Sequence, residues 1–160
     1  MKKYILVGII GFIIGIVITG AAMYNMAPGM MLLEDESKFG FEETVTQLEA
    51  SIEANDWKLP AVHDLQKSMK KFGIEVNPVK VFELCHPDHA GKILKEGDER
   101  IVSTLMPCRV AIYEKPDGKT YISRMNSRLM AKPMGGIISE VMTDAASENE
   151  NILDAIIKTK

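Results

Sequence analysis

The residues CRVAIYEKPDGKTYISR, from Cys108 to Arg124, carry the clearest local pattern in this chain. Apolar and polar side chains alternate up to Glu114 and again from Thr120 onward, which is typical of strands with one buried face. Between these runs, Pro116-Asp117-Gly118 contains an Asp-Gly step, which tight turns between antiparallel strands prefer. We therefore expect a β-hairpin here and, with it, an antiparallel sheet.

Upstream of the hairpin, helical and extended patterns follow one another. From Phe41 to Ala54, apolar residues recur every three or four positions, which predicts a helix with one buried face. The same criteria predict four more elements: a strand over residues 57–62, in which Pro60 favours an edge or a bulge, a helix over 63–72 ended by Gly73, a strand over 79–84, and a helix over 87–94 closed at Gly97.

Downstream of the hairpin, the sequence predicts helix again. Residues 137–142 and 152–157 are apolar with helical spacing, and the polar residues 147–151 separate them. This pattern predicts one interrupted helix or two short ones. The order of helix, strand, helix, strand, helix, hairpin and helix predicts an α+β domain whose mainly antiparallel sheet is covered by helices.

The first 33 residues form a separate apolar segment. No charged side chain occurs between Lys3 and Glu34, and about 20 apolar residues suffice to cross a bilayer core. We expect a transmembrane helix that Pro28-Gly29 breaks into a short exit linker. Residues 1–33 are then a membrane anchor and linker, and residues 34–160 are a soluble domain folded from about Phe39.

The charges beside this segment predict its orientation. Lys2 and Lys3 precede the apolar run and acidic residues follow it, so the amino terminus is expected in the cytoplasm and the domain in the periplasm or outside the cell. A cleaved signal peptide is the alternative, because small residues stand at positions 20–22. Gly11 and Gly15 form a small-xxx-small pair, a weak indication of a dimer.

Composition excludes several classes of protein. The 160 residues are 46% hydrophobic and 26% charged, with a net charge of −3 and two cysteines. These values do not fit a basic nucleic-acid-binding protein, a disulfide-dense miniprotein or a disordered acidic tail. Nucleotide-binding glycine loops and the Gly-x-Ser-x-Gly elbow are absent from the sequence. We therefore expect a binding protein more than an enzyme.

Three segments resemble a known family. They are residues 62–66 (VHDLQ), residues 81–87 (VFELCHP) and residues 105–114 (LMPCRVAIYE). They are similar to the family called domain of unknown function 302, over about residues 39–135, with a helical segment at 136–160 outside it. The resemblance implies a small α+β domain, similar in topology to the TATA-binding protein and often dimeric. Many members have Gly-Asn-Pro where this chain has Cys85-His86-Pro87, so a role of Cys85 is expected only in a subset.

Four residues form the strongest candidate site. Cys85, His86 and His89 follow one predicted strand, and Cys108 opens another. If these strands are antiparallel neighbours, the end of one lies beside the start of the other. Thiolate and imidazole together suit zinc, copper or haem iron. We expect a cofactor-binding or metal-binding module at these four residues, serving a membrane redox or transport system.

The two cysteines have other interpretations. A disulfide between Cys85 and Cys108 suits an oxidising compartment. It would close a loop and thereby stabilise the folded state by roughly 3 kcal/mol. They are alternatively buried, unlinked thiols, or a reactive pair that relays disulfides or sulfur. In a third hypothesis the domain is a homodimeric assembly module in which the cysteines are only structural.

Other candidates have plain structural explanations beside functional ones. Asp64 is expected to cap a helix with His63 as an exposed neighbour, and Arg109 to pair with a carboxylate. Methionines gather in two groups. The first, near the membrane exit, suits either a copper site or an apolar collar: Met23, Met26, Met30 and Met31. The second, after the hairpin, suits either the cover of a pocket or packing in the core or a dimer interface: Met125, Met130, Met134 and Met142.

Overall fold

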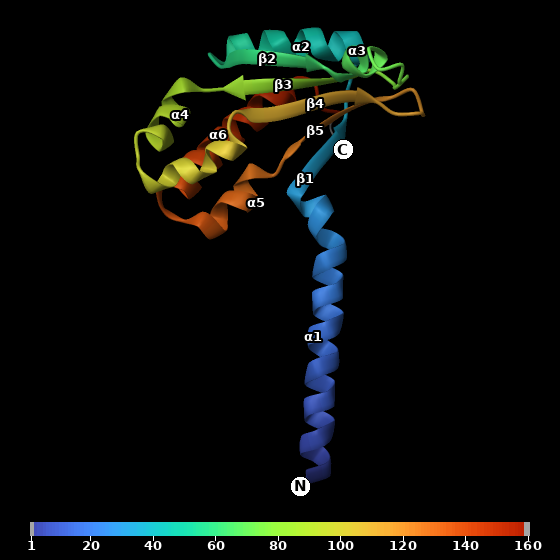
Figure 1. The fold of residues 1–160 in the computed structure, drawn as a ribbon, viewed down its shortest axis with the longest axis vertical. Coiled ribbons are helices and arrows are strands. Elements are labelled where there is room, and N and C mark those ends of the chain that lie inside the picture. The colour runs from blue at the N-terminus through green and yellow to red at the C-terminus, as the bar shows by residue number, and fades with distance from the viewer. Residues whose placement is uncertain (1, 159–160) are drawn as a thin grey trace.

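A computed structural model describes residues 2–158 and contains one five-stranded antiparallel sheet (Figure 1). The strand order is β1-β5-β4-β3-β2. The strands are β1 (Leu32–Glu36), β2 (Lys58–Asp64), β3 (Val79–Cys85), β4 (Cys108–Glu114) and β5 (Thr120–Met125). The predicted hairpin is confirmed, since β4 pairs with β5 and Gly118 takes the left-handed conformation that its turn requires, with φ of 77°.

The two longest helices of the domain pack on one face of this sheet. The helical elements of the domain are α2 (Phe41–Ala54), α3 (Leu65–Lys70), α4 (Pro87–Leu94), α5 (Ser127–Ala131) and α6 (Gly136–Asp154), with 3-10 turns η1 (Asp98–Leu105) and η2 (Lys132–Met134). The main core joins α2 and α6 to the sheet, and its fully buried side chains include Leu48, Phe82, Ile112 and Ile152. The α+β class, the antiparallel sheet and its helical cover are thus confirmed.

The prediction of an exit linker was wrong. Helix α1 (Lys2–Met31) continues through Pro28, and the chain then enters β1, so the folded part begins at Leu32 and not near Phe39. The acidic residues that follow α1 are paired with cations: Glu34 with Lys115, Asp35 with Arg124, and Glu36 with Lys119. These partners lie about 80 residues away, so local sequence could not show the strand.

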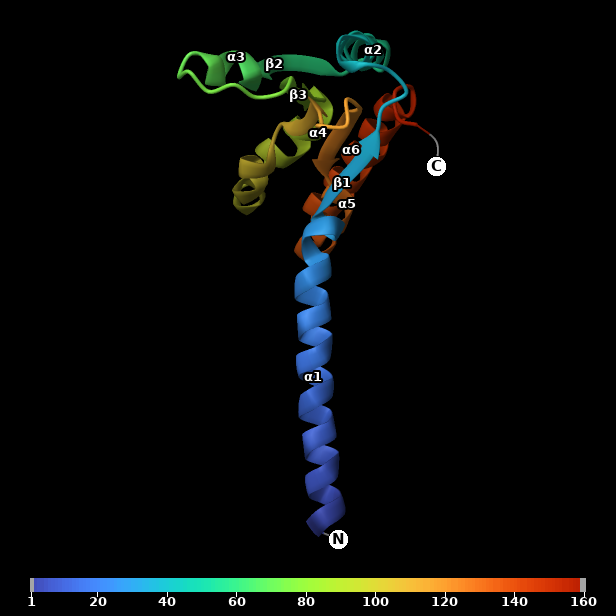
Figure 2. The same cartoon turned by 90° about the vertical axis from the view of Figure 1, so that its right-hand side faces the viewer.

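Helix α1 stands away from the domain as a stalk (Figures 1 and 2). It is long and apolar enough to cross a membrane, and its most apolar stretch is not buried in the protein. Length and composition suit both an anchor and a signal sequence. The end of α1 is tied to the domain, because Asn126 donates to the carbonyl oxygens of Met30 and Met31 at 3.0 and 2.8 Å.

The carboxyl-terminal helix also differs from the prediction. Helix α6 runs without interruption through residues 147–151. Polar side chains in that stretch have partners on other elements: Ser147 accepts a hydrogen bond from Arg128, Glu148 bonds to His89, and Glu150 bonds to Arg124. The polar residues therefore join the helix to its surroundings and do not break it.

Candidate functional site

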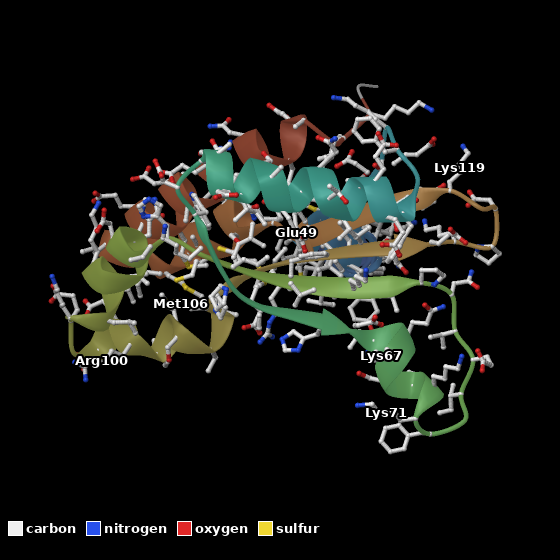
Figure 3. The ribbon with its side chains drawn as sticks, turned by 90° about the horizontal axis from the view of Figure 1, so that it is seen from above. Glu49, Lys67, Lys71, Arg100, Met106 and Lys119 are labelled. Carbon is white, nitrogen blue, oxygen red and sulfur yellow. The ribbon has the colours of Figure 1, made fainter. Side chains whose placement is uncertain are left out.

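A small cavity lies at the end of the sheet opposite the hairpin turn. In Figure 3, the labels Met106 and Arg100 mark this end of the sheet, and the label Lys119 marks the hairpin turn at the opposite end. The cavity has a volume of about 50 Å³. It lies between the main core and a second apolar cluster of Ile93, Val102 and Val141, which joins α4, η1 and α6. All four predicted site residues line it, beside Trp57, Met106 and Met142.

The sheet register places the two cysteines at this end. Strands β3 and β4 are antiparallel neighbours, and Leu84 is paired with Cys108, so Cys85 is the next residue along β3. Both cysteines are free thiols, and the structure contains no disulfide between them. Burial, together with the neighbouring Cys85, raises the pKa of Cys108 to about 11. The Cys108 thiol is therefore protonated at neutral pH.

The two histidines come from the start of α4. His86 is the N-cap residue, Pro87 opens the helix, and His89 lies three positions after His86. This spacing puts both rings on one side of the first turn, where their centroids are 4.8 Å apart. Trp57 lies against both rings, at centroid distances of 5.7 and 6.2 Å.

Each histidine leaves one ring nitrogen without a partner. The Nδ1 atoms of His86 and His89 are buried and have no hydrogen bond to any described residue. A buried polar atom in this state carries a desolvation cost of about 1 to 3 kcal/mol. Such atoms are uncommon in folded proteins, and a bound water or ion is one of the accepted explanations for them.

Glu148 on α6 fixes the other nitrogen of His89. The Nε2 atom of His89 is 2.9 Å from Oε1 of Glu148, and the Trp57 indole donates to Oε2 of the same carboxylate at 3.0 Å. Burial raises the pKa of Glu148, but the hydrogen bonds from His89 and Trp57 outweigh it and leave the pKa below its usual range. The carboxylate therefore favours the tautomer in which Nε2 carries the proton and Nδ1 has a free lone pair.

The cavity is not a preformed metal centre. Within residues 2–158, no three His, Cys, Asp or Glu side chains are already grouped in a way that could hold a metal ion. The predicted ligands share one cavity, but side-chain rotations are required before they meet at a common point. An open groove outside α4 also includes His86, His89 and Glu148, and provides a route from solvent to the histidines.

The other candidate residues lie outside the cavity. Asp64 accepts from the Lys67 amide and caps α3, as predicted, and the pairing of Arg109 with a carboxylate is confirmed at Glu83. His63 bonds to the same carboxylate on the surface. Met142 is the one member of the second methionine group in the cavity lining, and the first group lies exposed on the last turns of α1.

Sequence reasoning missed three residues of the site. Trp57, just before β2, and Met106, two residues before β4, line the cavity, and Glu148 on α6 bonds to His89 from outside it. The chain has a single tryptophan, which was the one available signal, but composition does not say where it packs. Glu148 looked like any other acidic residue on an exposed helix face.

The comparisons with known proteins identify a family and a fold. Residues 33–159 match the family described as "Domain of unknown function DUF302". This match extends beyond residues 39–135, on which the resemblance rested. The chain is similar to the crystal structure of an uncharacterized conserved DUF302 protein from Bacillus stearothermophilus, with a TM-score of 0.70 and 21% identity over 79% of this chain and 98% of that one. No curated protein matches significantly.

Proposed function

Because the chain belongs to the DUF302 family, whose name states no activity, we propose a function from the site: a membrane-tethered, extracytoplasmic module that binds a soft metal ion. The ion occupies the cavity between Cys85, Cys108 and the two histidines. The module supplies or holds this ion for a redox or transport system in the same membrane.

The observation that carries this proposal is the pair of unpartnered Nδ1 atoms. Both atoms are buried, and their rings line the same cavity as the two free thiols, so four side chains with donor atoms border one small volume. Metal-binding histidines commonly donate their second ring N–H to a carboxylate, and the contact between His89 and Glu148 has this form. A bound ion would satisfy both orphan nitrogens at once.

The donor atoms favour copper in its reduced state. Thiolates and thioethers select Cu(I) over harder ions, and Met106 and Met142 add thioethers to the lining of the cavity. Zinc uses thiolate and imidazole ligands as well and is the main competitor. The volume of the cavity, about 50 Å³, is far below the 300 Å³ or more of sites for organic ligands, and this favours an ion as the ligand inside it.

Binding is coupled to proton release and local rearrangement. Burial keeps the Cys108 thiol protonated at neutral pH, so a metal ion held by its sulfur would have to displace that proton. Rotation of the cysteine side chains about their Cα–Cβ bonds would be needed to bring the sulfur and nitrogen donors together. The groove outside α4 gives the ion access to the histidines first.

The thiol-relay alternative has less support. A relay needs an accessible cysteine with a depressed pKa, whereas burial raises the pKa of Cys108 to about 11. Retention of the anchor is supported by the continuity of α1 with β1 and by the bonds from Asn126 to the end of α1. The lysines at its start favour an orientation with the domain outside the cytoplasm. The homodimer remains a prediction.

The experiment is a metal titration of the full-length protein in detergent under anaerobic, reducing conditions. Cu(I) is added in competition with a chromogenic Cu(I) chelator, and Zn(II) is titrated separately. We expect one Cu(I) per chain, with affinity lost in Cys85→Ser and in His89→Ala.

A matched control is His63→Ala. His63 is also an imidazole bonded to a carboxylate, but it lies on the surface outside the cavity. This variant should bind as the parent does. Binding that is absent in the parent, or that is equal in parent and Cys85→Ser, would overturn the proposal.

A further inference from the structure

The direct junction of α1 with β1 sets the height of the domain above the membrane. Helix α1 has 30 residues, so it is roughly 45 Å long. A hydrocarbon core of about 30 Å takes up about 20 of them. With the lysines at its start on the cytoplasmic side, Tyr4 to about Met23 fill the core. Residues 24–31 then cross the outer headgroup layer.

One part of the domain comes down beside these last turns. Helix α5 packs against α1, and Asn126, just before it, donates to the carbonyl oxygens of Met30 and Met31. Figures 1 and 2 both show the segment α5–η2 extending from this junction toward the amino-terminal end of α1, and it is the part of the domain that lies furthest in that direction. This segment therefore reaches the headgroup layer.

The chemistry of the segment suits that location. Residues 127–136 contain Arg128 and Lys132 and no acidic residue. With Lys2 and Lys3 set aside, the rest of the chain has 17 basic against 22 acidic residues, so this basic stretch opposes the charge of its domain. Lys132 and Pro133 are exposed, and Met134 is 44% exposed.

The turn after Met134 holds these side chains at an edge. Gly135 and Gly136 both have positive φ, 64° and 52°, so the chain reverses sharply there and enters α6. Met134 and Lys132 are thus left at the tip of the reversal. An apolar side chain beside a cation is the combination that lies at a lipid interface, with the cation near the phosphates.

We propose that α5–η2 is a membrane-contact surface, which we define as Arg128, Lys132, Pro133 and Met134. Its partner is the phosphate headgroup layer of the membrane that α1 spans. Met134 and Pro133 enter the interface, and Lys132 binds anionic phosphates. Ser127, the first residue of α5, lines the metal cavity, so this contact also holds the cavity at a fixed height over the membrane.

This inference rests on the transmembrane part of the proposed function and not on metal binding. The test uses full-length protein in vesicles of phosphatidylcholine and phosphatidylglycerol with brominated acyl chains, which quench nearby tryptophan. Met134→Trp is compared with Phe72→Trp, whose side chain is 75% exposed in the loop after α3. The parent protein, with its buried Trp57, supplies the background.

We expect quenching of Met134→Trp to exceed that of Phe72→Trp by about twofold or more. Adding Lys132→Glu to Met134→Trp should reduce it. Equal quenching at the two positions would overturn the proposal of a membrane-contact surface. The exposed edge would then be a binding surface for a soluble protein. Lys132→Trp is a second probe of the same edge if Met134→Trp does not fold.

Phe12→Trp, in the middle of α1, separates the two possible failures. If it is quenched and Met134→Trp is not, the anchor spans the bilayer and the contact surface is wrong. If Phe12→Trp is not quenched, α1 does not span the bilayer, and the membrane part of the proposed function falls with the contact surface.

Discussion

The two ring nitrogens of His89 have opposite environments, and this difference determines what the residue can do. Nε2 is held by Glu148 at 2.9 Å, whereas Nδ1 is buried without a partner among the described residues. A histidine in this state is oriented as a ligand through Nδ1. In the proposed function, Glu148 therefore positions this ligand although it does not line the cavity.

Glu148→Gln should weaken Cu(I) binding by about 10-fold to 100-fold without unfolding the protein, because the amide no longer fixes the His89 tautomer. Competition with the chromogenic chelator measures the affinity, and nitrogen NMR of the imidazole reports the tautomer. Glu83→Gln is the matched control, since Glu83 also bonds to a histidine but does so on the surface. An unchanged tautomer and affinity in Glu148→Gln would exclude the positioning role.

The raised pKa of the Cys108 thiol should make both its alkylation rate and the stability of the domain depend on pH. Burial raises its pKa to about 11, so the thiolate that reacts with alkylating agents is scarce at neutral pH. In the metal-free protein, the alkylation rate of Cys108 should rise about tenfold per pH unit between pH 8 and 10. Because the raised pKa belongs to the folded state, stability should fall as pH rises above the ordinary thiol pKa toward 11.

The alkylation of Cys108 by iodoacetamide can be followed by mass spectrometry in the Cys85→Ser variant, in which Cys108 is the one remaining cysteine. In urea, where burial is lost, the rate should level off near the ordinary thiol pKa of about 8.5. A native rate that levels off below pH 8 would instead indicate an activated cysteine and would favour the thiol relay.

Among the elements, β1, β5 and α6 meet at one charged side chain. Arg124 on β5 has a side chain only 6% exposed, and it donates to Asp35 on β1 at 2.7 Å and to Glu150 on α6 at 2.8 Å. These bonds attach β1, the strand that follows α1, to the centre of the fold. An acidic edge strand is stable here because its charges have such partners.

Arg124→Ala should lower the free energy of unfolding by about 3 to 5 kcal/mol, because it leaves two carboxylates without their shared cation. Urea denaturation followed by circular dichroism measures this loss. The exposed pair between Arg109 and Glu83 is the comparison, and Arg109→Ala should cost less than about 1 kcal/mol. Similar losses in both variants would contradict the joining role of Arg124.

The hairpin turn depends on one backbone conformation. Gly118 has φ of 77°, so Gly118→Ala should destabilise the domain by about 1 to 2 kcal/mol through backbone strain. Gly97→Ala is the control, because Gly97 has φ of −82° and open space around it. Thermal unfolding compares the two variants, and equal midpoints would show that the turn tolerates a side chain.

For the whole molecule, the stalk and the sheet form one continuous path of chain. Helix α1 ends at Met31, β1 begins at Leu32, and β1 pairs with β5 along its length. Removal of the first 22 or so residues by a signal peptidase would leave an exposed apolar stub, including Met23 and Tyr24. This arrangement favours retention of the helix as an anchor.

Protein purified from membranes should therefore keep its full mass of 17.8 kDa, less any removal of the initiator methionine. Intact-mass spectrometry checks this, together with fractionation, in which only detergent should release the protein. A shorter, soluble product beginning near Met23 would show that the segment is a cleaved signal.

The sequence by itself determined those elements whose signals are local. The ranges of α2 and α4 follow from apolar spacing and from Pro87 at a helix start, and the β4–β5 hairpin follows from alternation and an Asp-Gly turn. Each of these signals lies within a few residues of the structure that it specifies. Antiparallel pairing of β3 and β4 then brought Cys85, His86, His89 and Cys108 to one cavity.

Only the tertiary structure decided the features that depend on distant partners. Strand β1 exists because cations about 80 residues away neutralise its acidic side chains, and α6 is continuous because its polar stretch bonds to other elements. Trp57, His89 and Glu148 are separated by up to 91 residues, so no local pattern relates them. The size of the cavity results from the packing of two apolar cores, and packing depends on the folded chain as a whole.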